Sequence, residues 1–267
     1  LTASGFHMGG ELNGSGDLVP AEDLYEACRV MGHHGDYLGN NRWDFSKLHT
    51  MPIDPEFTRL VESYLASVFS SDAENKGWNS NSAFVETSEG LLVFDTGSSE
   101  TIGKALIKAI RTVSNKPIKW VINSHSHGDH WLGNGAFVAE KPAQMIASDV
   151  AIDLMKSGGH DWMDRFNTMS DGATGKFTPV PAKDAVVKAM ARSFGGVQVQ
   201  ILFSGNSHSP GDIVFWMPQK SVLLTGDTMY TKRPPATFDA QVKQWAVFLK
   251  DLEGLKPTTV IPGHCPV

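Results

Sequence analysis

Residues 125–130 read HSHGDH and place four side chains that can bind metal within six residues of chain. His125 and His127 are two positions apart, so from the extended end of a strand they can point the same way and hold one ion. Asp129 and His130 follow a glycine that permits a bend, and they can hold a second ion. Imidazole and carboxylate ligands at this density suit zinc and related metals, and therefore predict a metal site.

Three more candidate ligands follow downstream, each with a glycine close by and a short apolar run beside it. They are His208 in SHSPGD, Asp227 in LLTGDT and His264 in VIPGH. Loops at the ends of strands are where a fold holds such ligands. HSHGDH alone could also be a solvated polar loop, but an apolar run at residues 118–122 leads into it and matching ligands recur. These two observations favour the metal site.

The order of these residues resembles that of the metallo-β-lactamase superfamily. Its signature, His-x-His-x-Asp-His, is followed by a lone His, then an Asp or Cys, and then a last His. The match spans about residues 78–264 and includes FDTG at residues 94–97. The resemblance implies an α/β fold, the four-layer αββα sandwich of this superfamily, with helices outside two packed sheets. It also implies one metal held by His125, His127 and His208, a second held by Asp129, His130 and His264, and a bridge formed by Asp227.

By the same resemblance, the chain is expected to be a binuclear hydrolase with two zinc ions per chain, iron or manganese being the alternative metals. A metal-bound hydroxide would attack an ester, lactone, thioester, sulfate ester or related small substrate. Asp129 could also orient that hydroxide. Tyr230 stands three residues after Asp227, the offset at which N-acyl homoserine lactonases place an oxyanion-stabilising tyrosine, although a packed aromatic residue fits equally well. Asp95 is expected to fix a ligand imidazole or a loop backbone, with a simple turn former as the alternative.

Other functions stay open. Superfamily members that hydrolyse β-lactams carry Cys or Ser where this chain has Asp227, which weakens that prediction without removing it. Persulfide dioxygenases resemble the same motif set but bind a single iron, which would leave Asp129 and His130 idle. A catalytically silent member would be expected to have lost some of the ligands, yet all seven positions are intact here.

The composition predicts a globular protein without a nucleic-acid surface. Of the 267 residues, 41% are hydrophobic and 19% are charged, and 23 basic against 29 acidic residues give a net charge of −6. That balance, without a long basic cluster, predicts a small-molecule partner rather than a nucleic acid. No apolar stretch approaches the roughly 18 residues of a membrane span. Two cysteines are too few for a disulfide framework, so a periplasmic and a cytoplasmic location both fit, and the oligomeric state stays open.

Hydrophobic patterning predicts two similar halves in which strands and helices alternate. In the first half, a helix capped by Ser98 or Ser99 separates two strands, which should be parallel because a crossover connects them. Strands are predicted at residues 91–95, 117–125, 144–147, 197–203, 213–217, 221–225 and 259–261. Helices are predicted after the cap at Ser98 or Ser99, with an apolar stripe over residues 102–113, from residue 149, and over about 239–252.

Three regions fall outside this plan. Residues 1–55, rich in glycine and histidine, predict an N-terminal extension to a metallo-β-lactamase-fold domain over residues 56–267. Residues 57–69 carry a helical apolar stripe, although the resemblance favours a strand nearby. Residues 157–195 are interpreted as an insertion, either a surface helix that packs its apolar face or a lid over the metal site that sets substrate choice. Its large apolar residues are Trp162, Met163, Phe166, Met169 and Phe177.

Overall fold

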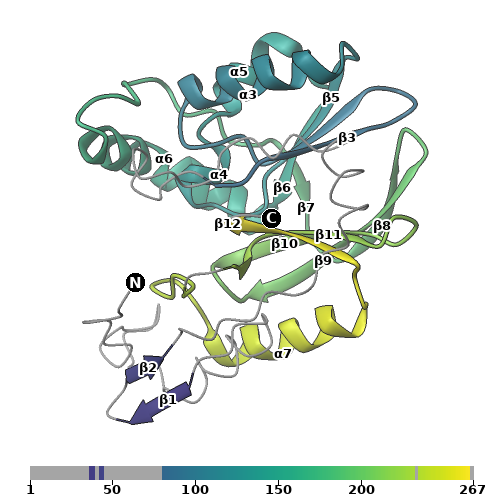
Figure 1. The fold of residues 1–267 in the computed structure, drawn as a ribbon. Coiled ribbons are helices and arrows are strands. Elements are labelled where there is room, and N and C mark those ends of the chain that lie inside the picture. The colour runs from purple at the N-terminus through teal and green to yellow at the C-terminus, as the bar shows by residue number, and fades with distance from the viewer. Residues whose placement is uncertain (1–35, 40–41, 45–79, 232–233, 265–267) are drawn as a thin grey trace.

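Two five-stranded sheets pack face to face and helices cover both outer faces (Figure 1). The computed structural model describes residues 36–39, 42–44, 80–231 and 234–264. Within these ranges the strand order is β3-β4-β5-β6-β7 in the first sheet and β12-β11-β10-β9-β8 in the second. Helices α3, α5 and α6 lie on the first sheet and α7 lies on the second (Figure 1). The predicted αββα sandwich is confirmed.

The first sheet is mainly parallel, with one antiparallel strand at its edge. Strands β4, β5, β6 and β7 run parallel, and β3 pairs with β4 in the antiparallel sense. Parallel neighbours need crossover connections, which the helices supply. The elements are β3 (Ala83–Glu86), β4 (Leu91–Phe94), α3 (Glu100–Val113), β5 (Ile118–Ile122), α4 (Gly128–Trp131), α5 (Asn134–Phe137), the 3-10 helix η2 (Val138–Glu140), β6 (Gln144–Ser148), α6 (Asp149–Met169) and β7 (Asp184–Val186).

The second sheet is an antiparallel meander closed by one parallel strand. Strands β8 to β11 each pair with the next, and β12 then pairs in parallel with β11. Its elements are β8 (Met190–Phe194), β9 (Val197–Asn206), β10 (Pro210–Met217), β11 (Val222–Tyr230), α7 (Val242–Gly254) and β12 (Thr259–His264). A separate two-stranded hairpin is formed by β1 (Asp36–Gly39) and β2 (Arg42–Asp44).

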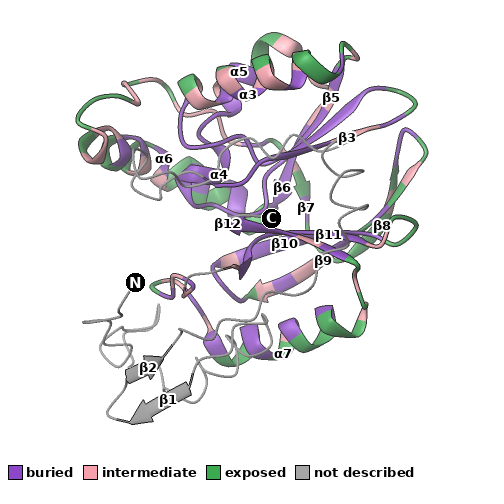
Figure 2. Ribbon diagram, viewed as in Figure 1, coloured by how far each residue is buried: buried purple, intermediate pink, exposed green. Residues whose placement is uncertain are grey.

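Alternate residues of each strand face different layers, as the period of a strand requires. In β4, Leu92 and Phe94 belong to the core between the two sheets, whereas Leu91 and Val93 belong to the core beneath the helices. Trp245 of α7 lies in a third core, on the outer face of the second sheet. Figure 2 shows the buried residues, in purple, along the sheets and on the helix faces turned toward them. Both faces of each sheet are therefore covered, which explains the nearly continuous apolar runs.

Helix α3 begins where the sequence predicted. The Ser99 hydroxyl accepts a hydrogen bond from the backbone N–H of Ile102 at 3.3 Å, which identifies Ser99 as the N-cap. At Gly103, the helix lies against Gly133, the residue just before α5. A Cβ added to Gly103 would lie 2.5 Å from the backbone oxygen of Gly133. Glycine at this position therefore allows the helix to pack closely.

Residues 157–195 contribute to three elements of the fold. Residues up to Met169 continue α6, and β7 and β8 become the edge strands of the two sheets. The helix continues through Gly158 and Gly159, and the absence of a side chain at Gly159 allows Trp131 to pack against the helix. A Cβ there would lie 2.8 Å from the ring of Trp131. The surface-helix interpretation is confirmed for residues 157–169, since Met163 and Phe166 are buried in the core.

Other boundaries shift by a few residues. Strand β11 extends to Tyr230 and β12 to His264, beyond the ends predicted at 225 and 261, and α7 begins at Val242. Nearly all of the predicted N-terminal extension, its boundary at residue 55, and the ambiguous stretch 57–69 lie outside the described residues. None of the helices in the described ranges is both long and apolar enough to span a membrane.

We expect Leu106→Ala to lower the free energy of unfolding by about 2–5 kcal/mol, because it leaves a cavity beneath α3. The Leu106 side chain is 1% exposed and packs in the core under that helix. Lys108→Ala, on the exposed face of the same helix, is the matched control and should change stability little. Urea denaturation of both variants measures the difference. Equal losses would contradict the packing described for α3.

Candidate metal centre

The seven ligands predicted from sequence come together at one end of the sandwich. They form two groups, in each of which the candidate ligand atoms lie within 4.8 Å of one another, and all are buried. The first group is His125, His127, His208 and Asp227, and the second group is Asp129, His130 and His264. Four of them come from the connection after β5, one from the loop between β9 and β10, and two from β11 and β12. Both sheets therefore contribute to the site.

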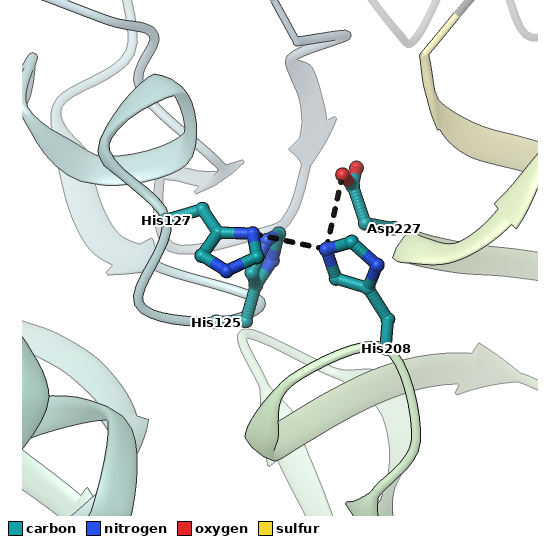
Figure 3. Close-up of side chains that lie close together, drawn as sticks. All are labelled: His125, His127, His208 and Asp227. Atoms are coloured by element: carbon teal, nitrogen blue, oxygen red, sulfur yellow. Dashed lines mark hydrogen bonds and ion pairs between the residues drawn. The ribbon is translucent and has the colours of Figure 1, made fainter. Parts of the chain in front are cut away.

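Nitrogen and oxygen atoms converge in the first group (Figure 3). His208 Nε2 lies 3.0 Å from His127 Nδ1 and 3.4 Å from Asp227 Oδ2. The ring of His125 lies 4.7 Å from that of His127 and 5.0 Å from that of His208, measured between centroids. Three imidazoles thus surround one small volume with a carboxylate at its border.

The second group meets the first at Asp227. His264 Nε2 lies 3.1 Å from Asp129 Oδ2 and 3.2 Å from Asp227 Oδ2. His130 Nε2 lies 3.0 Å from Asp227 Oδ1. One carboxylate therefore contacts imidazoles of both groups.

The buried donor atoms of this site fit a metal. Among the described residues, His125 Nε2 is a buried side-chain atom with no hydrogen-bond partner, and His130 Nε2 and Asp227 Oδ1 lie 3.0 Å apart without the geometry of a hydrogen bond. A buried polar atom costs free energy unless it is paired, and groups of this kind are rarely left so in proteins. Three imidazoles with a carboxylate are the donor types that zinc prefers. The residues present could thus hold one ion in each group.

Asp95 orients one imidazole of each group. Its carboxylate accepts hydrogen bonds from His130 Nδ1 at 2.7 Å and from the Ser124 hydroxyl at 2.8 Å. The same hydroxyl lies 2.9 Å from His125 Nδ1 and accepts a hydrogen bond from it when that nitrogen is protonated. The prediction that Asp95 fixes the imidazole of a candidate ligand is confirmed, whereas no pattern in the sequence indicated Ser124.

Asp212 holds the loop that carries His208. Its buried carboxylate accepts hydrogen bonds from the Ser207 hydroxyl at 2.8 Å and from the Ser209 backbone N–H at 2.9 Å. Burial raises the pKa of Asp212 to about 6, although the hydrogen bonds from Ser209 and Ser207 oppose the shift. The loop on both sides of His208 is therefore tied to one acidic side chain.

Two glycines allow Asp227 to reach the site. A Cβ on Gly263 would overlap the Asp227 carboxylate, and Gly226 has φ of +51°, a conformation that favours glycine. The pairing of β11 with β12 is irregular on both sides of Gly226. Such irregularities change the direction of nearby side chains. The sequence shows glycines beside the candidate ligands, but no pattern in it indicated this role for Gly263.

The electrostatics differ between the groups. Burial lowers the pKa of His208 to about 3 and that of His125 well below its usual value, because a buried cation loses its hydration. Burial acts in the same direction on His130, but Asp227, Asp129 and Asp95 outweigh it and raise the pKa of His130 well above its usual value. His208 and His125 are therefore neutral imidazoles, the form that binds metal.

Tyr230 reaches the site as well. Its side chain is buried, its hydroxyl donates a hydrogen bond to Asp227 Oδ2, and its ring stacks on that of His264 at 5.5 Å. The stretch of β11 that carries Asp227 also pairs Tyr230 with His264 across to β12. The hydroxyl thus contacts the carboxylate shared by the two groups.

Helix α6 borders the first group. The ring of Trp162 lies 5.2 Å from that of His127, and a Cβ on Gly128 would lie 2.8 Å from the Trp162 Cβ. The helix therefore packs directly against the HSHGDH segment. A role for it in setting substrate choice stays a prediction.

Comparison with known proteins is consistent with this geometry. A family model described as the metallo-beta-lactamase superfamily matches residues 75–264. The chain is 24% identical over 192 residues to a metallo-beta-lactamase type 2 of Bacillus cereus, covering 69% of this chain and 66% of that protein. It is 24% identical over 216 residues to a linear primary-alkylsulfatase of a Pseudomonas species, covering 67% of this chain and 40% of that protein.

Solved structures agree in fold. A metallo-beta-lactamase from Pontibacter korlensis superposes with a TM-score of 0.57 at 22% identity, covering 70% of this chain and 80% of that one. The likeness extends over most of the described residues. The chain belongs to the metallo-beta-lactamase superfamily, and its relatives from Bacillus cereus and Pseudomonas are hydrolytic metalloenzymes, the class that its sequence predicted.

Proposed function

We propose that this protein is a binuclear zinc-dependent hydrolase that acts on an ester, lactone, thioester, sulfate ester or related small substrate. One observation carries the proposal: the Asp227 carboxylate contacts imidazoles of both groups. A carboxylate that contacts both sets of candidate ligands suits a pair of cations, since its negative charge lowers their mutual repulsion. His125, His127 and His208 would hold one zinc, Asp129, His130 and His264 the other, and Asp227 would bridge them.

When bound, the two zinc ions supply a Lewis acid for the substrate and lower the pKa of a water so that it can attack near neutral pH. The protein residues then orient and stabilise the reacting groups. Burial acts to raise the pKa of Asp129, but His130 and His264 outweigh it and hold this pKa below its usual value. Asp129 is therefore charged at neutral pH, and in our proposal it accepts a hydrogen bond from the attacking water and orients it.

The substrate class rests on charge and on the relatives. The two named relatives act, by their names, on different bonds, and at 24% identity neither chooses the bond for this chain. Hydrolysis of β-lactams is a second candidate, supported by the match to the Bacillus cereus protein. A mononuclear iron persulfide dioxygenase is the alternative from another reaction class, and it would use the first group alone. The net charge of −6 favours a small-molecule substrate over a nucleic acid.

Metal content tests the proposal first. Protein purified without added metal is expected to contain about two zinc ions per chain by mass spectrometry, as two-metal hydrolases do. Prolonged chelation should abolish hydrolysis of a panel of lactones, thioesters, aryl sulfates and a chromogenic β-lactam, and added zinc should restore it. One iron per chain, with oxygen consumed in the presence of a persulfide, would refute the hydrolase and favour the dioxygenase.

A pair of histidine variants provides the control for that measurement. His208→Ala should remove metal from the first group, whereas His160→Ala, at an exposed position of α6, should leave the zinc content unchanged. Equal zinc contents in the two variants would show that the metal binds elsewhere.

We expect Gly263→Ala to lower zinc affinity and activity, because the added methyl group displaces the Asp227 carboxylate that it would overlap. Gly254→Ala is the matched control, since a Cβ at this position, the last residue of α7, meets nothing within 4 Å. Competition with a chromogenic chelator measures zinc affinity in both variants. Unchanged affinity in Gly263→Ala would argue that Asp227 does not bind the metal.

Tyr230 is a proposed catalytic residue. If its hydroxyl donates to charge that develops on the substrate, Tyr230→Phe should lower kcat by about 10²–10³, the usual loss for one such donor. KM and zinc content should change little. A loss of zinc from Tyr230→Phe would instead indicate that the hydroxyl acts by holding Asp227, to which it donates a hydrogen bond.

A further inference from the structure

The connection between β11 and α7 reaches the first group from outside. The backbone oxygen of Ala236 lies 3.1 Å from His208 Nδ1, and Asp239 Oδ2 lies 2.9 Å from His127 Nε2. Two of the three imidazoles in the first group therefore have their outer nitrogen bonded to one short segment, residues 236–239. No sequence motif indicated this segment.

These contacts determine which ring nitrogen carries the proton. A neutral imidazole has one N–H and one lone pair. An ionised carboxylate can only accept a hydrogen bond, and Asp239 Oδ2 lies 2.9 Å from His127 Nε2. His127 Nε2 therefore carries the proton, which leaves the lone pair on Nδ1, the atom that lies 3.0 Å from His208 Nε2. The carbonyl of Ala236 fixes His208 in the same way, with its lone pair on Nε2.

The segment is itself held against the site. Two residues after the segment, the backbone N–H of Gln241 donates a hydrogen bond to the backbone oxygen of Ser207 at 2.9 Å. This bond ties the connection to the loop that carries His208. The ring of Phe238 stacks on that of His127, with 5.0 Å between centroids and 26° between planes. The Asp239 side chain is 45% exposed, so it is not part of the hydrophobic core. Its carboxylate contacts the imidazole of His127, and the charge of Arg165 also acts on it.

We propose that Asp239 is a positioning residue for the metal site, which holds His127 in the tautomer and orientation that direct Nδ1 to the ion of the first group. The proposal rests on the proposed function, since it requires zinc or a similar imidazole-binding divalent cation there. A carboxylate that accepts a hydrogen bond from the outer nitrogen also raises the basicity of a ligand imidazole, and loss of such a carboxylate commonly weakens metal binding. In the second group, His130 has Asp95 as its outer partner instead, so the effect of Asp239 is confined to the first group.

The experiment compares Asp239→Ala and Asp239→Asn with Asp251→Asn, an exposed aspartate of α7 that serves as the charge-matched control. Zinc competition with a chromogenic chelator yields the two dissociation constants of each protein. We expect Asp239→Ala to raise one of them roughly 10- to 100-fold and leave the other unchanged. Asp239→Asn should have a smaller effect, because an amide oxygen still accepts the hydrogen bond but lacks the charge.

A spectroscopic measurement separates positioning from a general structural effect. In the zinc-loaded wild-type protein, the ¹⁵N shifts of His127 should report a protonated Nε2, and Asp239→Ala should perturb the signal of this histidine and spare that of His130. Unchanged dissociation constants in Asp239→Ala would overturn the proposal. A parallel loss at both sites together with lower thermal stability would also overturn it, since that result indicates a structural role. Failure of the wild-type protein to bind zinc would refute the proposed function and this inference with it.

Discussion

The fold of this protein is organised around seven buried polar side chains whose inner atoms face one another. Burial of such atoms is unfavourable unless each is paired. An imidazole can satisfy this condition when one nitrogen faces the site and the other bonds to an outer partner. His130 uses Asp95, His125 uses Ser124, and His208 and His127 use the segment 236–239. The outer partners therefore fix the direction of every lone pair in the first group.

The packing of two sheets explains how these atoms can meet. Ligands after β5 come from the first sheet, and those in β11 and β12 come from the second, so neither sheet forms the site alone. The approach between the sheets requires small residues at the contacts. A Cβ on Gly226 would lie 2.5 Å from the Cβ of Ser124, and one on Gly263 would overlap Asp227. Glycine at these two positions allows the carboxylate that contacts both groups to sit between them.

The sequence predicted the candidate ligands because four of them share one short motif, the family resemblance added the other three, and metal chemistry restricts the residue types. It predicted most strands and helices because periodic burial sets their pattern. It did not reveal the roles of Ser124, Gly263 or Asp239, because these depend on long-range contacts, 112 residues apart in the case of Asp239 and His127. Nor did it show that α6 continues through Gly159, where the folded chain brings the ring of Trp131 close.

The same residues that position His127 also form the outer border of the first group. Trp162 lies on one side of the imidazole, Phe238 is stacked on it, and Asp239 bonds to its outer nitrogen. Phe238 is 45% exposed, so this border faces solvent, from which a substrate must approach. Under the proposed function, a substitution that altered substrate contacts here would also alter the environment of a candidate metal ligand. We therefore expect substrate preference and metal affinity in the first group to change together.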